Sequence, residues 1–423
     1  MKKLLFILLF TIPFIGFGQG WEKTFGGTDG EMGHSVQQTT DGGYIFCGTT
    51  ISFGNGLFDV YLIKTDSNGV EQWNKTFGGT GSDQGMSVQQ TTDGGYIITG
   101  HLFSLIFDND VYLIKTDGNG VEQWSQTFGG NGGDWGESVQ QTTDGGYIIC
   151  GGTRSFGDTL GDVYLIKTDS NGIEQWYKTF GGTNSSDYGY SVQQTTDGGY
   201  IICGGGNNDV YLIKTDGNGV EQWSQTFGGN GGDWGESVQQ TTDGGYIITG
   251  YLFSLIFDGG VYLIKTDSNG IEQWNQTYGQ EGDWGSSVQQ TTDGGYIICG
   301  WTSFINDHDV YLIKTDVNGD SLWTKTFGGT SHDWGSSIQQ TTDGGYIICG
   351  WLTDTFVNNS DVYLIKTDGN GNVTSTFNIP TPSSNRKLIK VVDILGRETK
   401  SQPNTPFIEI YDDGSVEKKI VIE

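Results

Sequence analysis

The stretch GGNGGDWGESVQQTTDGGYII occupies residues 129–149 and returns without a change at residues 228–248. It is part of a longer period, because S-[VI]-Q-Q-T-T-D-G-G-Y-I and V-Y-L-I-K-T-D each occur seven times in the chain. Self-similarity with a period of about 50 residues indicates a repeat architecture in which each repeat forms one supersecondary unit. One tryptophan marks each period, namely Trp21, Trp73, Trp124, Trp176, Trp223, Trp274 and Trp323.

Each period contains four segments with the composition of β-strands. In the first period they are residues 35–39, 43–49, 59–65 and 70–77. Thr-Asp-Gly-Gly joins the first pair and Asp-x-Asn-Gly joins the last pair, and both favour tight turns because Gly and Asn accept positive φ. Tyr-Ile-Ile and Val-Tyr-Leu-Ile are apolar on both faces, which is typical of strands covered on both sides. We predict an all-β propeller of four-stranded antiparallel blades, because a β-solenoid has shorter coils and a sandwich does not repeat its sequence.

The number of blades follows from the two ends of the repeat region. A strand of the fourth type, Trp21–Phe25, precedes any strand of the first type, and the fourth segment of the last period, residues 372–377, lacks the tryptophan. Seven complete blades result only if Trp21–Phe25 pairs with the third strand of the last period, at residues 361–367. Such pairing also removes an open sheet edge. We therefore predict a seven-bladed β-propeller that the N-terminal strand closes.

The composition is that of a folded, turn-rich β chain, and its charge makes some partners improbable. Among 423 residues there are 72 Gly and 5 Pro, with 13 Trp, 20 Tyr and 22 Phe available for a core. Disordered low-complexity chains are poor in aromatic residues. The net charge of −29 repels phosphate backbones and anionic lipid. Nucleic acid is therefore not expected as a partner, whereas cations, neutral sugars and peptides stay open.

The two ends of the chain differ from the repeat region. Two lysines and the apolar run that follows them have the pattern of a secretory signal peptide, assigned to residues 1–18. No later apolar stretch is long enough for a membrane-spanning helix, so no transmembrane segment is predicted. The propeller is assigned to residues 19–377, a Pro/Ser/Asn-rich linker to 378–385, and a small C-terminal β domain to 386–423. We expect a protein that leaves the cytoplasm.

Two parts of the chain resemble known families. The phrases W-x-[KQ]-T-[FY]-G-G, G-G-Y-I-I-x-G and D-V-Y-L-I-K-T-D-x-N-G resemble the bacterial β-propeller repeat family over residues 21–372, which implies the fold and no particular chemistry. The C-terminal phrases KLIKVVDILGRE and IEIYDDGSVEKKIVIE resemble the C-terminal sorting domain of type IX (Por) secretion in Bacteroidetes. That resemblance implies the type IX secretion machinery as a partner. It also implies passage to the outer-membrane surface or exterior of a Gram-negative bacterium, commonly with removal of the tail.

The connections on one face of the ring vary, and that face is the predicted binding surface. The loop between the second and third strands reads RSFGDTLGD at 154–162 and GGNND at 205–209, while the turns on the opposite face are nearly constant. A rigid scaffold with variable loops on one face often presents a binding surface. The blade-to-blade loop on that face carries an Asp followed by an aromatic residue in five periods. The candidate ligand-binding pairs are Asp134 and Trp135, Asp187 and Tyr188, Asp233 and Trp234, Asp283 and Trp284, and Asp333 and Trp334.

Two interpretations of these Asp-aromatic pairs are open. Aromatic platforms and carboxylates around the channel mouth suit sugars, whose apolar faces stack on Trp while acids accept hydroxyl hydrogen bonds. Alternatively each Asp bonds its own loop backbone and the ring packs against the next blade, because residues that recur in a repeat array usually serve repeat packing. The first two periods depart from the pattern, with Met32 after Glu31 and Gln84 after Asp83. The tryptophan of the fourth strand is predicted to lie in the core between blades.

The sequence offers no evident catalytic or metal constellation. The four histidines, His34, His101, His308 and His332, fall at unrelated repeat positions without zinc spacing, and no serine-nucleophile motif is present. The Asp-x-Asn-Gly turns lack the further ligands and the closing Glu of an EF-hand, so turn chemistry is their expected role. No metal site and no cofactor are predicted.

The cysteines share one position of the repeat. That position lies in the second strand, and it is Thr99 or Thr249 in the two remaining blades. Equivalent sites in separate blades are too far apart for a disulfide, so buried, reduced thiols are predicted. The five cysteines are Cys47, Cys150, Cys203, Cys299 and Cys349.

Three classes of function agree with the sequence. Verbatim duplication of a period suits a scaffold or multivalent binder better than a catalyst, because an enzyme needs unlike groups that converge at one place. The favoured hypothesis is a secreted or cell-surface propeller that is not an enzyme and that binds a glycan or protein through its variable-loop face. A carbohydrate-active enzyme, either a lyase or a glycosidase with carboxylates at the channel mouth, is the second hypothesis. A purely structural surface component that associates with its own copies is the third.

Overall fold

The computed structural model describes most of the repeat region and three strands of the tail. The described residues are 20–373, without 105–107, 159, 184, 230, 255–258, 305–306 and 355–358, together with 388–393, 407–411 and 416–419. The predicted signal peptide at 1–18 and the predicted linker at 378–385 lie outside them. The chain divides into two compact units, Met1–Val373 and Thr374–Glu423, and each is described by itself.

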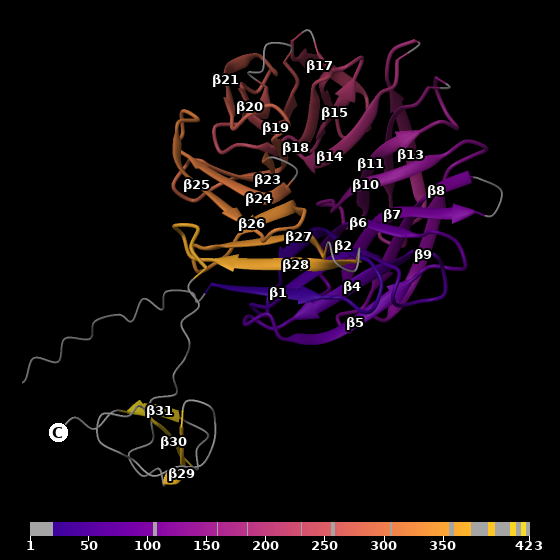
Figure 1. The fold of residues 1–423 in the computed structure, drawn as a ribbon. Coiled ribbons are helices and arrows are strands. Elements are labelled where there is room, and N and C mark those ends of the chain that lie inside the picture. Colours follow the sequence, from indigo (N-terminus) through magenta and orange to yellow (C-terminus); the bar gives the residue numbers. More distant parts are fainter. Residues whose placement is uncertain are drawn as a thin grey trace, which may run out of the picture. The chain divides into compact units, whose positions relative to one another are not determined.

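The first unit is a ring of seven four-stranded antiparallel sheets, as predicted (Figure 1). Blade 1 contains β2 (Glu31–Gln38), β3 (Tyr44–Thr50), β4 (Asp59–Thr65) and β5 (Glu71–Phe77). Blade 2 contains β6 (Gln84–Gln90), β7 (Tyr96–Ser104), β8 (Asp108–Thr116) and β9 (Glu122–Phe128). Blade 3 contains β10 (Asp134–Gln141), β11 (Tyr147–Thr153), β12 (Asp162–Thr168) and β13 (Glu174–Phe180). Blade 4 contains β14 (Tyr188–Gln194), β15 (Tyr200–Gly206), β16 (Asp209–Thr215) and β17 (Glu221–Phe227).

The remaining three blades follow the same order around the ring. Blade 5 contains β18 (Trp234–Gln240), β19 (Tyr246–Leu252), β20 (Gly260–Thr266) and β21 (Glu272–Tyr278). Blade 6 contains β22 (Trp284–Gln290), β23 (Tyr296–Phe304), β24 (Asp307–Thr315) and β25 (Ser321–Phe327). Blade 7 contains β26 (Asp333–Gln340), β27 (Tyr346–Asp354), β28 (Asn359–Thr367) and β1 (Trp21–Phe25). In blade 1 every residue of β3 and β4 is buried, which confirms that the middle strands are covered on both sides.

The N-terminal strand closes the ring. β1 pairs antiparallel with β28, from Trp21 opposite Lys366 to Phe25 opposite Val362. The last sheet therefore has the order β1-β28-β27-β26, and Figure 1 shows the indigo β1 beside the yellow-orange β28. The predicted closure and the count of seven blades are confirmed.

The first strand of each blade begins earlier than the sequence suggested. β2 starts at Glu31 rather than at Ser35, because its pairing with β3 shifts between Gly33 and Ser35 and leaves His34 as an extra residue. Such a β-bulge lets a strand continue past one unpaired residue. The same shift occurs in all seven blades. The Asp-aromatic pairs therefore lie at the start of the first strand or directly before it, and not in the middle of a blade-to-blade loop.

Side chains of the S-[VI]-Q-Q motif join neighbouring inner strands. The Ser35 hydroxyl accepts a hydrogen bond from the Val88 N–H of the next blade at 3.2 Å, and Gln37 Oε1 accepts one from the Gln90 N–H at 2.6 Å. Both bonds recur at every interface, including that from blade 7 to blade 1. Since each such bond contributes about 1 kcal/mol net, the motif is constant because it holds the ring together.

The tryptophan of each outer strand packs on the following blade, as predicted. The Trp21 ring lies 5.8 Å from the Tyr44 ring, and the same contact recurs at all seven interfaces at 5.8 to 6.1 Å. The Trp21 ring also covers Gly69, where an added Cβ would lie 2.7 Å from ring atoms. Gly69 has a φ of +71°, so this turn position needs glycine both for its conformation and for the close approach of the ring.

The Asp-x-Asn-Gly turns bond their own backbone. The Asp66 carboxylate accepts hydrogen bonds from the Asn68 N–H at 2.8 Å and the Val70 N–H at 2.9 Å. The corresponding Asp accepts the same two bonds in the other six turns. Turn chemistry is therefore the role of these residues, as the sequence indicated.

A buried lysine pairs with the first turn in every blade. Lys64 is 3% exposed, and its Nζ lies 2.9 Å from the Asp41 carboxylate and 2.8 Å from the Thr65 carbonyl oxygen to which it donates. Burial acts to raise the pKa of Asp41, but hydrogen bonds from Thr39 and Lys64 overcome it and lower the pKa to about 2. A buried charge needs such a partner. The seven Lys–Asp pairs explain why T-T-D-G-G and L-I-K-T never vary.

The second unit contains a small antiparallel sheet. Its order is β29 (Leu388–Asp393), β30 (Phe407–Tyr411) and β31 (Val416–Lys419). The sequence predicted several short strands here.

Candidate functional site

The structure places all five Asp-aromatic pairs at the N-terminal end of the inner strands. The pairs of blades 3 and 7 open their strands, and in the other three blades the aromatic residue opens the strand directly after the Asp. The positions are Asp134 and Trp135 in β10, Asp333 and Trp334 in β26, Asp187 before Tyr188 in β14, Asp233 before Trp234 in β18, and Asp283 before Trp284 in β22. The inner strands gather around the centre of the ring in Figure 1, and the central hollow is lined by the Val-Gln or Ile-Gln residues of these strands, such as Val36 and Gln37.

The carboxylates of these pairs tie two loops of their own blade together. Asp233 accepts one hydrogen bond from the Gly229 N–H at 2.6 Å and another from the Phe253 N–H at 2.8 Å. All five carboxylates are at most 3% exposed and accept a backbone hydrogen bond from the preceding loop. Glu31 and Asp83 occupy this position in blades 1 and 2 and bond the loops in the same way. The aromatic partners, which are only half-buried, therefore carry the accessible chemistry.

Two of these rings, Trp284 and Trp334, belong to a larger group, which we call the aromatic arc. It spans blades 5 to 7 and consists of Tyr251, Trp284, Trp301, His308, Trp334 and Trp351. Trp284 lies between Tyr251 and Trp301 and is nearly parallel to both, with ring centroids 4.6 and 6.0 Å apart and interplanar angles of 11° and 5°. Each of these three rings is half-buried and keeps exposed surface.

A second stack extends the aromatic arc to the closing blade. Trp334 and Trp351 stack at 5.2 Å, and His308 lies 4.8 Å from Trp301 and 5.6 Å from Trp334, so it links the two stacks. Trp351 in turn lies 5.7 Å from His34 of blade 1. Burial lowers the pKa of His308, and the neighbouring His332 lowers it further. A neutral imidazole can both donate and accept a hydrogen bond, as a sugar hydroxyl does.

Blades 1 and 2 have no ring at the position after the acid. Met32 and Gln84 stand there, and the nearby histidines are His34 and His101. Burial lowers the pKa of both histidines to about 4, so both are neutral at pH 7. Blades 1 and 2 therefore offer fewer aromatic rings for stacking than the aromatic arc does.

A cavity of about 230 Å³, which we call the acidic cavity, opens between blades 3 and 4. Its walls are Trp135, Glu137, Gly152, Arg154, Tyr188 and Tyr190. Arg154 donates a hydrogen bond to the Tyr188 hydroxyl at 3.0 Å, and its guanidinium carbon lies 5.1 Å from the centroid of Trp135. The site combines a cation over an aromatic face with a carboxyl group in one small volume.

Two glutamates of this region hold protons more tightly than usual. Burial raises the pKa of Glu137 to about 8, and the charge of Glu236 in blade 5 adds to the rise. Burial also raises the pKa of Glu236 to about 7, although a hydrogen bond from Trp284 opposes the rise. Tyr190 of blade 4 interacts with both carboxyl groups, and burial raises its pKa. Near neutral pH these two groups can therefore donate as well as accept a proton.

Two sets of residues on this face were not predicted from the sequence. The first is the bulge residue of each inner strand, which is His34, Met86, Glu137, Tyr190, Glu236, Ser286 or Ser336. This position changes from blade to blade inside a nearly constant motif, and that variation was the available signal. The second set, Tyr251, Trp301 and Trp351, lies directly opposite the first-strand rings in the strand pairing. Alignment of the second strand to the first would have found it.

The cysteines have a structural role. All five are buried and free, as predicted, and burial raises the pKa of the Cys150 thiol. In blade 5 the Thr249 hydroxyl donates to the Tyr262 carbonyl oxygen at 3.0 Å, and Thr99 makes the same bond in blade 2. Threonine replaces cysteine here because its extra polar group finds a partner on the neighbouring strand.

The described part of the chain shows neither a metal-ligand cluster nor a membrane-spanning helix. No three His, Cys, Asp or Glu side chains of those residues are grouped so that they could hold a metal ion. In the same residues, no helix has both the length and the apolar character that a membrane span requires.

Comparison with known proteins returns similar folds at low sequence identity. No protein-family model matches the chain, and no curated protein matches it. Sqt1 from Chaetomium thermophilum is 11% identical with a TM-score of 0.47, over 94% of this chain and 97% of that chain. The Pan2 WD40 domain from Neurospora crassa is 10% identical with a TM-score of 0.49, over 80% and 89%. Chaetomium thermophilum Sqt1 bound to the N-terminus of ribosomal protein L10 is 12% identical with a TM-score of 0.47, over 94% and 98%.

The fold defines the class of protein. Seven four-stranded antiparallel blades, the last completed by the N-terminal strand, make a seven-bladed β-propeller. Propellers of this kind commonly serve as scaffolds for binding, with the ligand recognised by side chains set on a rigid ring.

Proposed function

We propose that this propeller is a binding module that recognises a glycan or a protein through its variable-loop face, and that it is not an enzyme. The observation that carries the proposal is the aromatic arc, in which half-buried rings of three adjacent blades contact one another without interruption. Packing inside a repeat would need the same ring in every blade, yet the second-strand rings Tyr251, Trp301 and Trp351 occur in three blades only. Residues that a shared scaffold does not require are candidates for recognition.

A glycan is the ligand that the aromatic arc suits best. Flat rings with one exposed face stack on the C–H faces of sugars, and a few polar groups fix the orientation of the ligand. The polar groups within the arc are the Tyr251 hydroxyl, which donates to Glu281, and the neutral His308. The carboxylates of the five Asp-aromatic pairs accept hydrogen bonds from the loop backbone. They would therefore hold the loops beside the rings and would not contact the ligand.

The proposal is tested with a glycan array followed by titration of the best ligand. Trp301→Ala removes the end of the three-ring stack and should weaken binding at least about tenfold, as expected for loss of a central aromatic contact. Tyr177→Ala is the matched control, because Tyr177 is a 41% exposed ring on the outer strand of blade 3, away from the arc. Unchanged affinity in Trp301→Ala, or equal losses in both variants, would remove the aromatic arc as the binding site.

A second candidate function rests on Glu137 and Glu236. Two carboxyl groups whose pKa values lie near neutrality are suited to general acid and base catalysis, as in a carbohydrate-active lyase or glycosidase. Turnover of a polysaccharide by the purified protein, lost in both Glu137→Gln and Glu236→Gln, would favour catalysis. Glycan binding without turnover would favour the proposal that the protein is a binding module.

We further propose that the protein is exported and displayed outside the cell. The supporting features are the signal-like residues 1–18 and the resemblance of residues 386–423 to a type IX sorting domain, which would engage the type IX secretion machinery. A fusion of both segments to a fluorescent protein should reach the surface of a Bacteroidetes host, while the fusion without the tail should stay in the periplasm. Periplasmic retention of the full fusion would reject the sorting role.

A further inference from the structure

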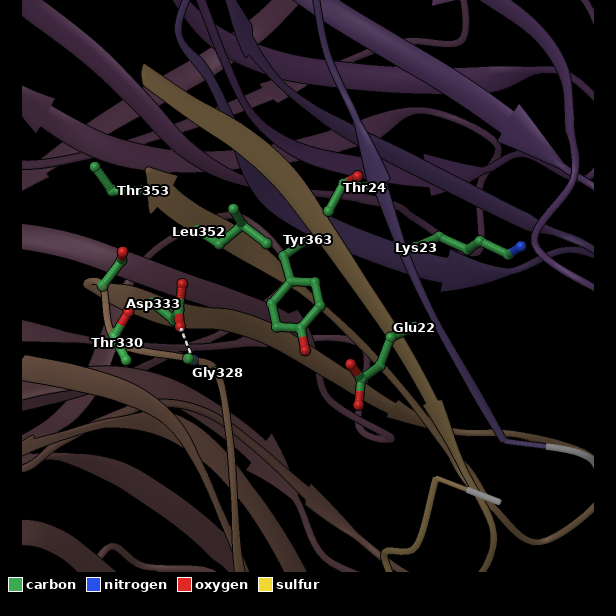
Figure 2. A pocket seen from close by; sticks show the side chains of 11 residues that line it. Glu22, Lys23, Thr24, Gly328, Thr330, Asp333, Leu352, Thr353 and Tyr363 are labelled. Atoms are coloured by element: carbon green, nitrogen blue, oxygen red, sulfur yellow. Dashed lines mark hydrogen bonds between the residues drawn. The ribbon is translucent and has the colours of Figure 1, made fainter. Parts of the chain in front are cut away.

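A second hollow lies between blades 6 and 7, and we call it the blade 7 socket. Its volume is about 530 Å³. Tyr363 and Leu352 form its apolar side, Asp333 lies on one wall, and Glu22 and Thr24 of β1 lie on the other. Figure 2 shows the Tyr363 ring between Leu352 and Glu22, with Lys23, which also lines the socket, directed away from the ring.

The blade 7 socket is separate from the aromatic arc. Tyr363 and Leu352 pack in the core that blade 7 shares with blade 6. Trp351, the neighbour of Leu352 in β27, contacts His34 of blade 1 instead. No residue of the aromatic arc lines the socket, so the two features can be tested independently.

Blade 3 shows what the equivalent space accommodates. There Phe156 lies over two rings, with centroids 5.6 Å from Tyr164 and 4.9 Å from Tyr177. Tyr164 is the second residue of V-Y-L-I-K, as Tyr363 is in blade 7, and Tyr177 follows the repeated tryptophan, as Glu22 does. The chain therefore places a phenyl group of its own where blade 7 has the socket.

Blade 1 repeats this arrangement by the same local device. Phe53 lies 5.5 Å from Tyr61, which is again the tyrosine of V-Y-L-I-K. Thr50 accepts a hydrogen bond from the Phe53 N–H at 3.2 Å, and Thr153 of blade 3 accepts one from the Phe156 N–H at 3.1 Å. The T-x-S-F-G sequence thus forms a hydroxyl-capped turn that directs the phenylalanine onto the tyrosine.

Blade 7 lacks this device. Leu352 stands at the position of Thr50 and Thr153, and leucine has no hydroxyl to cap the turn. Leu352 packs beside Tyr363 and adds apolar surface to the hollow. The space that two other blades fill with a phenyl ring is therefore bounded by described side chains that leave about 530 Å³ between them.

We propose that the blade 7 socket binds an aromatic side chain of a partner polypeptide, next to a basic residue of the same partner. The internal precedent for the ring is Phe156 on Tyr164. The argument for the basic residue is the exposed Glu22 carboxylate at the rim, together with a chain whose net charge is −29. Burial of one phenyl ring against an apolar floor supplies affinity, and a charge at the rim supplies selectivity.

Blade 4 provides a contrast within the molecule. It has an open hollow of about 280 Å³ over Tyr211, the equivalent of Tyr363. Gly206 replaces Leu352 there, and Ser224 follows the repeated tryptophan in place of Glu22. The blade 4 hollow therefore lacks the apolar wall and the outer-strand acid, although Asp187 lines it as Asp333 lines the socket, so it is not expected to prefer a basic aromatic segment.

The proposal is tested with short peptides on the full chain. The probe is N-acetyl-Lys-benzoylphenylalanine-Lys-amide, which crosslinks on illumination, and the attachment sites are read by mass spectrometry. We expect crosslinks in residues 20–25 and 350–366. The peptide Lys-Phe-Lys should compete for these crosslinks, Glu-Phe-Glu should compete at least about tenfold less well, and Lys-Ala-Lys should not compete.

Three variants locate the site. Thr24→Phe places a ring beside Tyr363, its partner in the strand pairing, and should abolish crosslinking at blade 7. Glu22→Gln should keep the crosslink but remove the preference for Lys-Phe-Lys over Glu-Phe-Glu. Phe156→Ala empties the equivalent space of blade 3 and should create a second crosslinked site there, without a preference for basic peptides because Tyr177 stands where blade 7 has Glu22.

Three results would overturn the proposal. The first is a blade 7 crosslink that persists in Thr24→Phe, and the second is the absence of crosslinks at blade 7. The third is competition by Lys-Ala-Lys that equals competition by Lys-Phe-Lys, since the socket would then not recognise an aromatic ring. Trp301→Ala should leave the peptide crosslink unchanged, so failure of the aromatic arc as a ligand site would be distinguishable from failure of the socket.

Discussion

Residues 110–149 and 209–248 have identical sequences, yet they build different sites. In the first copy Trp135 lies opposite Gly152 and meets Tyr188 and the Arg154 guanidinium. In the second copy Trp234 lies opposite Tyr251 and meets Tyr190, with centroids 6.3 Å apart. The tryptophans themselves cannot account for the difference, because the sequence around them is the same.

The difference comes from residues just outside each copy. Position 152 is glycine and position 251 is tyrosine, and each lies three residues after the last residue of its duplicated segment. The repeat motif thus fixes where a side chain stands, while the second strand and the next blade fix what surrounds it. This division allows a chain to duplicate its scaffold and to diversify its surface separately.

The largest expected loss of stability comes from removing the carboxylate partner of the buried lysine, and it should be the same in both copies. Asp144→Asn and Asp243→Asn each leave a lysine that is 3% exposed without its carboxylate partner. Removal of the carboxylate should cost about 2 kcal/mol, because the lysine stays buried. This is less than for a fully buried ion pair, since Asp144 and Asp243 are more than half exposed and solvent screens them. Urea denaturation should show two losses of stability that agree within about 0.5 kcal/mol.

Glu122→Gln is the control for these two variants, because Glu122 is an exposed carboxylate of an outer strand. It should change stability by less than about 0.5 kcal/mol. Clearly unequal losses in Asp144→Asn and Asp243→Asn would show that even the constant part of the repeat depends on its neighbours.

The two duplicated glutamates should differ in their pH dependence. The folded-state pKa is raised from 4.5 to about 8 for Glu137 and to about 7 for Glu236. A raised pKa favours the folded protein while the group is protonated, so this stability is complete below pH 4.5 and is lost as the pH rises to the folded-state value. Glu137→Gln should therefore stabilise the protein at pH 9, by about 1–2 kcal/mol after allowance for solvent screening.

Melting temperatures between pH 5 and 9 measure this difference. Both glutamates should make the melting temperature fall as the pH rises. The part of this fall that Glu137→Gln removes should extend to about pH 8, and the part that Glu236→Gln removes should end about one pH unit lower. Glu236→Gln should also lower the apparent pKa of Glu137, since the charge of Glu236 contributes to its rise. Identical pH profiles of the two variants would mean that the surroundings of the copies do not differ at this position.

The same comparison separates what the sequence could predict from what it could not. Blade number, strand order and closure by Trp21–Phe25 follow from counting repeats, because each constant residue has a repeated partner, such as Lys64 with Asp41. The bulge at His34 could not be predicted, since an extra residue in a strand is visible only from the pairing of both strands. The site depends on contacts between blades, such as Tyr251 with Trp284, and periodicity within one repeat does not report such contacts.

The smallest change in stability is expected from substitutions directly after the two copies, at Cys150 and Thr249. Cys150→Thr and Thr249→Cys exchange side chains of similar volume, and the threonine hydroxyl finds a carbonyl acceptor on the third strand of its blade. Each exchange should change stability by less than about 1 kcal/mol. Thiol titration should find no reactive cysteine in either folded variant, four after denaturation of Cys150→Thr and six after denaturation of Thr249→Cys, because each change alters the count of five by one. A disulfide in Thr249→Cys, detected by mass spectrometry, would contradict the separation of these positions into different blades and the equivalence of the two copies.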